Sequence, residues 1–367
     1  MSKEVLKRTT PKSKKNYLKY SVAADISKEK FDGCISVIDT NQHVKVIASR
    51  SFKNSKGGFN EFEQWHQNKC KEPIPVVFTM EATGIYYEKL AWFLYRKDYH
   101  VSVVLPNKSK KYLQCLGLKS KNDKIDSIGL ARMGAEQCLP KWEAPDDVIV
   151  ELRDITRYRE SLQQSRTRFN NQLSAYICAE YVNDTIVEGL KNMIDVLDQQ
   201  IIHSEELIKD KINSNEDLKT GIENISSVKG LGLISIATIL AETNCFKMFS
   251  NLPQLVSYAG YDVVENQSGK HIGKTKISKK GNAHIRRILH MPAFNVVRYG
   301  VPEFVNQYER IYEKTRIKMK GYVAIQRKLL CLIYTLWKNN EHYDPERYKS
   351  NKHPEMQSRS SSFRMAS

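Results

Sequence analysis

The chain has 367 residues, of which 41% are hydrophobic and 27% charged, and it carries a formal net charge of +17. This composition favours a soluble globular protein, and no apolar run reaches the length of about 18 residues that a membrane-spanning helix needs. A positive surplus of this size favours a polyanionic partner. Nucleic acid fits better than a membrane surface, because no basic amphipathic anchor is evident.

The seven cysteines are scattered along the chain and form no C-x-x-C pair. This pattern argues against a disulfide framework and against a structural zinc site. Residues 1–16 are basic and polar and lack the apolar centre of a secretory signal. We therefore expect a disordered basic arm on a protein that stays in the cytoplasm.

The first domain, expected over residues 17–140, alternates strand and helix patterns. Three consecutive strands are followed by helix, strand, helix, strand and helices. The predicted strands are 20–26, 31–39, 43–52, 75–80 and 100–105, and the predicted helices are 59–68, 85–97, 108–116 and 123–137. This order predicts an α/β mixed sheet with helices on its faces, as expected of a ribonuclease H-like domain.

The next region, over residues 147–215, contains no proline and only one glycine, Gly189, and its apolar residues recur at helical spacing. The pattern predicts two long helices that form an antiparallel hairpin or a coiled coil. Such an arm could join subunits or could pack on its own domain, and the sequence leaves both open.

A mainly helical C-terminal domain is expected over residues 221–342, with a disordered tail over 348–367. It begins with a helix, a glycine-rich turn and a second helix, which resembles a helix-hairpin-helix. The backbone N–H groups of such a turn can hold a phosphate, so Lys229, Gly230 and Gly232 are candidate nucleic-acid contacts. A tight helical corner is the alternative. Further helices are predicted over 283–298 and 321–338.

Four acidic residues stand where the predicted elements bring distant parts of the chain together. Asp25 ends the first strand, Glu81 follows the fourth, and Asp123 and Asp126 share one helix face because they are three residues apart. An acid inside an apolar strand is costly unless it is compensated. Carboxylates are the ligands that Mg²⁺ prefers, and two such ions could activate the attacking and leaving oxygens of a phosphodiester. Each acid taken alone could be an ordinary surface group.

A serine lies in a cationic, turn-rich segment near residue 268. The Ser268-Gly269 pair is followed by seven basic candidates for phosphate contacts: Lys270, Lys274, Lys276, Lys279, Lys280, Arg286 and Arg287. Nearby cations could stabilise a serine alkoxide that attacks phosphorus. A Ser-Gly pair is also a common turn, so the residues alone favour that plainer interpretation.

Together, in order, these motifs resemble those of the insertion-sequence "one-ten" transposases, which are related to the Piv DNA invertases. The resemblance covers about residues 20–340. Its blocks are Asp25-Ile26-Ser27-Lys28, Glu81-Ala82-Thr83-Gly84-Ile85-Tyr86, Lys121-Asn122-Asp123-Lys124-Ile125-Asp126, Val228-Lys229-Gly230-Leu231-Gly232, and Ser268-Gly269 with Ile277-Ser278-Lys279-Lys280-Gly281-Asn282 and Arg286.

The resemblance implies a RuvC-like domain whose Asp-Glu-Asp-Asp tetrad binds Mg²⁺ (or Mn²⁺), here Asp25, Glu81, Asp123 and Asp126. It implies a serine transposase domain in which Ser268 is the nucleophile that becomes linked to DNA. It further implies a bacterial, nucleoid-associated recombinase that forms dimers or tetramers and is guided by a non-coding bridge RNA. Base pairing would then read the sequence while the protein holds the backbones.

Small departures from the family pattern stand at Ala24, where glycine is usual, and at Ser127, where alanine is common. Ser278 is a second serine nearby, and Ser268 is preferred because its Ser-Gly pair matches better. Two alternatives remain: a RuvC-like nuclease or junction resolvase without serine chemistry, and a non-catalytic nucleic-acid-binding protein.

Overall fold

The structure is a computed structural model that describes residues 16–346 except 83, 118–122, 266, 269–270 and 274. The chain divides into two compact units, residues 1–144 and 145–367. The expected N-terminal arm, apart from Asn16, and the expected C-terminal tail lie outside the described residues. Within the described part of the chain, no helix combines the length and apolar character needed to cross a membrane.

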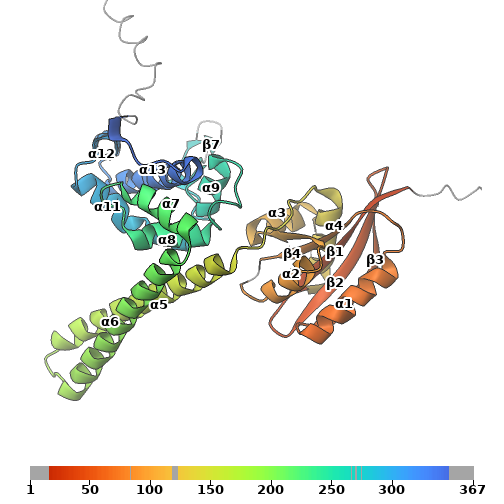
Figure 1. The fold of residues 1–367 in the computed structure, drawn as a ribbon, viewed down its shortest axis with the longest axis horizontal. Coiled ribbons are helices and arrows are strands. Elements are labelled where there is room, and N and C mark those ends of the chain that lie inside the picture. The colour runs from red at the N-terminus through yellow and green to blue at the C-terminus, as the bar shows by residue number, and fades with distance from the viewer. Residues whose placement is uncertain are drawn as a thin grey trace, which may run out of the picture. The chain divides into compact units, whose positions relative to one another are not determined.

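The first unit is built on a five-stranded mixed sheet of order β3-β2-β1-β4-β5 (Figure 1). Strands β1 to β3 are antiparallel neighbours, β4 runs parallel to β1, and β5 runs parallel to β4. The strands are β1 (Tyr17–Ile26), β2 (Lys30–Asp39), β3 (Val44–Lys53), β4 (Val76–Glu81) and β5 (His100–Val104). The predicted mixed α/β sheet is therefore confirmed.

Helices cover both faces of this sheet. The helices are α1 (Lys56–Lys69), α2 (Glu88–Tyr95), α3 (Pro106–Cys115) and α4 (Asp123–Glu136). One face packs an aromatic core that includes Phe31, Phe62 and Phe78 against α1. The other face packs Ala23 and Cys34 against α4. Because side chains alternate along a strand, odd-numbered residues of β1 face α4.

Small residues let α4 approach the sheet closely. A Cβ atom at Gly134 would lie 2.2 Å from Thr79 Oγ1 and 2.3 Å from Ser21 Oγ. Both of these hydroxyls are buried and have no hydrogen-bond partner. The closeness of this contact fixes where the rest of α4 lies along β1.

The second unit begins with two long helices, α5 (Asp147–Ile177) and α6 (Asp184–Asn213), which lie side by side (Figure 1). Asn183 starts α6 by accepting hydrogen bonds from the backbone N–H groups of Thr185 and Ile186. The predicted pair of long helices is confirmed, and supercoiling of the pair stays a prediction. The arm belongs to the same compact unit as the C-terminal helices.

In the rest of the second unit, the helices share one hydrophobic core with the base of α5 and α6, and short strands lie between α9 and α10 in the chain. They are α7 (Glu216–Ser226), α8 (Leu233–Glu242), α9 (Leu252–Ala259), the short strands β6 (Val263–Val264), β7 (Gln267–Ser268), β8 (His271–Ile272) and β9 (Lys276–Ile277), and α10 (Ala283–Ile288), α11 (His290–Arg298), α12 (Pro302–Thr315) and α13 (Lys318–Asn339).

The single helix predicted over 283–298 is wrong, because the chain breaks between α10 and α11 at Leu289. Pro292 explains the break. It has no N–H to donate to the carbonyl of Ile288, and its ring would clash with that carbonyl in a continuous helix.

Candidate active site

Asp25 is the centre of a group of carboxylates in the first unit. Burial, followed in order of influence by the negative charges of Asp126, Asp123, Glu81 and Asp32, raises the pKa of Asp25 to about 6. The four acids predicted from the sequence therefore lie within electrostatic range of one another. Their catalytic role stays a prediction.

Strand register explains how the sheet brings three of these acids together. Ala24 pairs with Met80 in the parallel β1–β4 pair. The next residues, Asp25 and Glu81, therefore lie side by side at the carboxyl ends of these two neighbouring strands. Asp25 stands directly opposite Asp32 in the antiparallel β1–β2 pair. Alternation turns all three side chains to the face that α4 covers.

Helix α4 supplies the other two acids because it runs antiparallel to β1. Gly134 lies beside Ser21, and Leu130 packs in the cluster of Ala23. Following the helix back by one more turn brings Asp126 level with Asp25. Asp123 and Asp126 thus reach the site from the first turn of α4.

Asp32 and its partners form a part of the site that sequence reasoning missed. Asp32 is buried and accepts a hydrogen bond from the Ser51 hydroxyl. The Lys30 ammonium lies 3.7 Å from Asp32 and 3.5 Å from Asp123, so it bridges β2 to α4. The short turn between the first two strands would have placed Asp32 opposite Asp25, had the hairpin register been derived from the sequence.

Glu81 is also held by a residue that the sequence did not single out. The hydroxyl of Ser109, which is buried on α3, donates to Glu81 Oε2 at 2.6 Å. This bond fixes the carboxylate at the end of β4.

The donor chemistry fits a hard divalent cation, because every candidate ligand is a carboxylate oxygen. Like charges around Asp25 are destabilising until a cation compensates them. Among the described residues, no group of three or more His, Cys, Asp or Glu side chains is close enough to hold a metal ion as it stands. Closer approach of these carboxylates is therefore what cation binding would require.

The predicted serine lies in the second unit, in the short strand β7. Ser268 pairs with His271 of β8, in an antiparallel hairpin whose turn residues lie outside the described chain. The competing Ser278 has a structural partner: its hydroxyl donates to Asp262 Oδ1 at 2.7 Å and accepts from the N–H of Lys280 at 3.2 Å. Through these two hydrogen bonds, Ser278 stabilises the base of the hairpin.

The predicted basic contacts differ in their surroundings. Lys276, Lys279 and Lys280 are exposed, whereas Lys270 and Lys274 lie outside the described residues. The Arg286 guanidinium donates to the carbonyls of Ala259, at 2.7 Å, and Asn282, at 3.1 Å, which ties it to the backbone. The first three lysines are therefore the better placed phosphate contacts.

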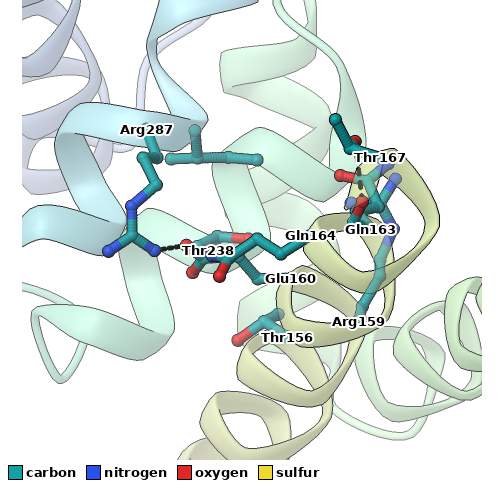
Figure 2. A pocket seen from close by; sticks show the side chains of 9 residues that line it. Thr156, Arg159, Glu160, Gln163, Gln164, Thr167, Thr238 and Arg287 are labelled. Atoms are coloured by element: carbon teal, nitrogen blue, oxygen red, sulfur yellow. Dashed lines mark hydrogen bonds and ion pairs between the residues drawn. The ribbon is translucent and has the colours of Figure 1, made fainter. Parts of the chain in front are cut away.

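Arg287 is paired with Glu160 of α5, as Figure 2 shows. The pair lies at a shallow cavity of about 350 Å³ between α5, α8 and α10. Arg159, which also lines this cavity, is paired with Glu205. Both arginines are thus already compensated by a carboxylate.

A buried polar network holds the start of α10, the helix that carries Arg286 and Arg287. Arg157 donates two hydrogen bonds to Glu242, at 2.6 and 2.8 Å, and Asn282 donates a third at 2.7 Å. Burial would raise the pKa of Glu242, but these hydrogen bonds and the Arg157 charge outweigh it and hold that pKa below its usual value. Asn282 also caps α10 by accepting from the N–H groups of His284 and Ile285.

The glycine-rich turn joins α7 to α8 as expected. Gly230 has a φ of 98°, and a Cβ there would lie 3.1 Å from the backbone nitrogen of Val296, so only glycine fits against α11. Lys229 lies over the ring of Tyr299, 5.4 Å from its centroid. Gly232 caps α8 and has open space around it, which leaves that helix end approachable.

Comparisons with known proteins agree with this arrangement. A family model described as "Transposase" matches residues 22–179, and one described as "Transposase IS116/IS110/IS902 family" matches residues 222–309. The pilin gene-inverting proteins of Moraxella bovis and Moraxella lacunata are each 31% identical to this chain over 329 residues. The match covers 88% of this chain and 97% of each relative.

The matches define a DNA recombinase of the transposase class. The chain belongs to the IS110 family of transposases.

Two solved structures show weaker likeness. Thermus thermophilus RuvC in complex with a Holliday junction substrate has a TM-score of 0.24 and 11% identity, over 32% of this chain and 93% of that chain. The Aquifex aeolicus member of the Ppx/GppA family has a TM-score of 0.20 and 10% identity, over 91% and 96%. Neither likeness is close enough to carry an argument.

Proposed function

We propose that this transposase cuts and rejoins the DNA of an insertion sequence by metal-dependent chemistry, with a ribonuclease H-like first domain and Ser268 as the nucleophile. The observation that carries the metal proposal is the raised pKa of Asp25, which reports four further carboxylates around it. Carboxylates gathered at the carboxyl ends of β1 and β4 suit the polarisation of a phosphodiester.

Asp25, Glu81, Asp123 and Asp126 would hold Mg²⁺ or Mn²⁺, which would stabilise charge on the phosphate and its leaving oxygen. Ser109 keeps the Glu81 carboxylate in place at 2.6 Å. The Lys30 ammonium, at 3.5 Å, does the same for Asp123. Both contacts orient oxygens without competing for the central position of Asp25.

In the proposed serine step, the Ser268 oxygen forms an ester bond to phosphorus and loses its proton. The bond from phosphorus to the leaving strand breaks, and that strand departs as a hydroxyl that has taken up a proton. Rejoining reverses these bonds with the hydroxyl of a different strand. The exposed Lys276, Lys279 and Lys280 would counter the phosphate charge near the hairpin.

A test compares wild type, Asp25→Asn and Ser268→Ala in strand exchange on element-end DNA. We expect both variants to lose exchange, and we expect Ser268→Ala to lose a covalent protein–DNA adduct detectable after denaturation. Cysteine or alanine at Ser278 serves as the matched control and should keep the adduct. Full exchange by Asp25→Asn would refute the metal site, and an adduct formed by Ser268→Ala would refute the nucleophile.

A second candidate is a nuclease or junction resolvase that uses only the carboxylates. It is supported by the placement of the acids in the first unit and the serine in the second. It predicts that Ser268→Ala still cleaves DNA with no loss of rate.

Further parts of the proposal concern partners. The surplus of +17 charge suits a long RNA guide as well as DNA. We propose that the protein acts as a dimer or tetramer with a bridge RNA. Purification with and without ribonuclease, followed by sequencing of the retained RNA, would test this. Recovery of no element-encoded RNA would contradict it.

A further inference from the structure

A run of aromatic side chains lies on the surface of the second unit, away from the Ser268 hairpin in sequence. We call it the aromatic ladder, and its members are His290, Phe294, Tyr322, Tyr308 and Tyr312. Adjacent ring centroids are 6.0, 3.9, 4.7 and 6.1 Å apart in that order. The rings come from α11, α13 and α12, so three helices build one row.

The local sequence favours this row over burial of the rings in the core. Tyr308 lies flat against α13 because Gly321 has no side chain, and a Cβ there would come within 2.6 Å of the tyrosine ring. Phe294 stays 40% exposed although it is wholly apolar. Phe294 is thus the exposed member of the ladder, whereas the other four rings are half-buried and Tyr308 also packs against the core of the unit.

Polar atoms and cations accompany the rings. Tyr308 is hydrogen-bonded to Tyr322, and partial desolvation together with this bond raises the pKa of Tyr308, whereas the nearby Lys318 charge lowers it. Exposed apolar side chains extend the surface at Met291 and Met319, which are 61% and 52% exposed.

The helices around the ladder are strongly cationic. Helices α10, α11 and α13 contain no Asp or Glu, and their Lys and Arg residues are Arg286, Arg287, Arg298, Lys318, Lys320, Arg327, Lys328 and Lys338. Helix α12, which supplies Tyr308 and Tyr312, carries the acids Glu303, Glu309 and Glu313. The Lys328 ammonium lies 3.5 Å from the Glu303 carboxylate and compensates its negative charge.

We propose that the aromatic ladder, with the cations of α11 and α13, binds unpaired bases of a DNA strand during recombination. Rings offer a stacking surface to any base, and cations hold the sugar-phosphate backbone, which is how sequence-tolerant single-strand sites work. Strand exchange opens duplex DNA, so this enzyme's own reaction supplies such a strand. An apolar protein partner fits less well, because α11 and α13 carry Lys and Arg but no Asp or Glu, and this positive charge attracts phosphates.

The site lies apart from the proposed chemistry, so it can be tested by binding alone. Phe294→Leu and Tyr322→Leu keep apolar bulk but remove the ring faces. We expect each to weaken binding of a single-stranded DNA oligonucleotide about 5- to 150-fold, in line with roughly 1–3 kcal/mol for each stacked base. Duplex DNA of the same sequence should bind both variants within about twofold of wild type, because its bases are already stacked.

The matched control is Tyr181→Leu, an 89% exposed tyrosine between α5 and α6 that follows Glu180. It should leave single-strand binding unchanged. Thermal unfolding of each variant separates lost stacking from lost folding. If a ring variant does not fold, Lys318→Gln with Lys320→Gln provides the alternative. It should reduce the salt dependence of single-strand binding by about 1.4 in the log–log slope, at about 0.7 for each phosphate contact.

Unchanged single-strand binding by folded ring variants would overturn the proposal. Equal losses for single-stranded and duplex DNA would also overturn it, because base stacking would then play no part. A loss confined to single-stranded RNA would assign the surface to RNA and refute the DNA assignment. None of these outcomes depends on Ser268 or on the carboxylates.

Discussion

Replacing Asp25 by asparagine should stabilise the cation-free protein while it abolishes strand exchange. Burial and the charges of Asp126, Asp123 and Glu81 all oppose ionisation of Asp25. Asparagine has nearly the same shape and no charge, so it removes this repulsion. A site built for function is expected to cost stability in this way.

The magnitude follows from the pKa. Folding raises the pKa of Asp25 from 3.8 to about 6, and one pKa unit is worth about 1.4 kcal/mol. Since the folded-state pKa is the higher one, the wild type is relatively most stable below about pH 4 and loses that advantage as the pH rises through about 6. At pH 8 the loss is about 3 kcal/mol, an upper value because Asp25 keeps some contact with solvent.

The assay is thermal unfolding of the full chain in EDTA between pH 4 and pH 8. At about 3 °C for each kcal/mol, Asp25→Asn should melt several degrees above wild type at pH 8 and level with it near pH 4. Glu29→Gln, which removes a charge from the exposed turn between β1 and β2, should show no such trend. A melting temperature of Asp25→Asn at or below wild type at pH 8 would refute the reasoning.

Three further predictions concern other contacts. Glu242→Gln should cost about 3 kcal/mol at pH 7, because it breaks a buried pair with Arg157. As folding lowers the pKa of Glu242 from its ordinary value of 4.5, the wild-type advantage should be full above that value and be lost progressively as the pH falls below it, measured by urea unfolding. Gly134→Ala should lower the free energy of unfolding by about 1–3 kcal/mol, seen as a lower urea midpoint, since its Cβ would lie 2.2 Å from Thr79 Oγ1, and a rise in midpoint would contradict the packing. Lys30→Met should change stability by less than about 1 kcal/mol, because the Lys30 side chain is 56% exposed. It should nevertheless lower the Mg²⁺ concentration for half-maximal thermal stabilisation about fivefold, from roughly 1 kcal/mol of relieved repulsion; an unchanged Mg²⁺ requirement would show that Lys30 does not face the site.

Much of the first unit could be predicted from the sequence because its elements are regular. The five predicted strands lie within a few residues of β1 to β5, since alternating and continuous apolar runs are strong local signals. Asp25 and Glu81 were grouped in the prediction because one ends the first predicted strand and the other follows the fourth. Asp32 was not predicted as a site residue, because its position opposite Asp25 depends on the β1–β2 register, which a scan of single strands does not use.

The second unit was harder to predict for reasons that its packing explains. Helices α9 and α12 each end at a left-handed residue, Gly260 and Arg316, and α9 is only 8 residues long, so it offers little pattern beside the long α5 and α6. The break before α11 depended on one proline. The aromatic ladder joins residues from three helices, so no pattern within a single helix predicts it.

The four tryptophans are divided unevenly between the two units, so tryptophan fluorescence can be made to report on each unit separately. Trp65, Trp92 and Trp142 lie in the first unit, and Trp337 alone lies in the second, pressed against Gly221 at the α7–α13 contact. Replacing Trp337 by phenylalanine would leave intrinsic fluorescence to report on the sheet domain alone. The converse triple replacement would give a probe of the helical domain, so loosening of either half could be followed while the other stays folded.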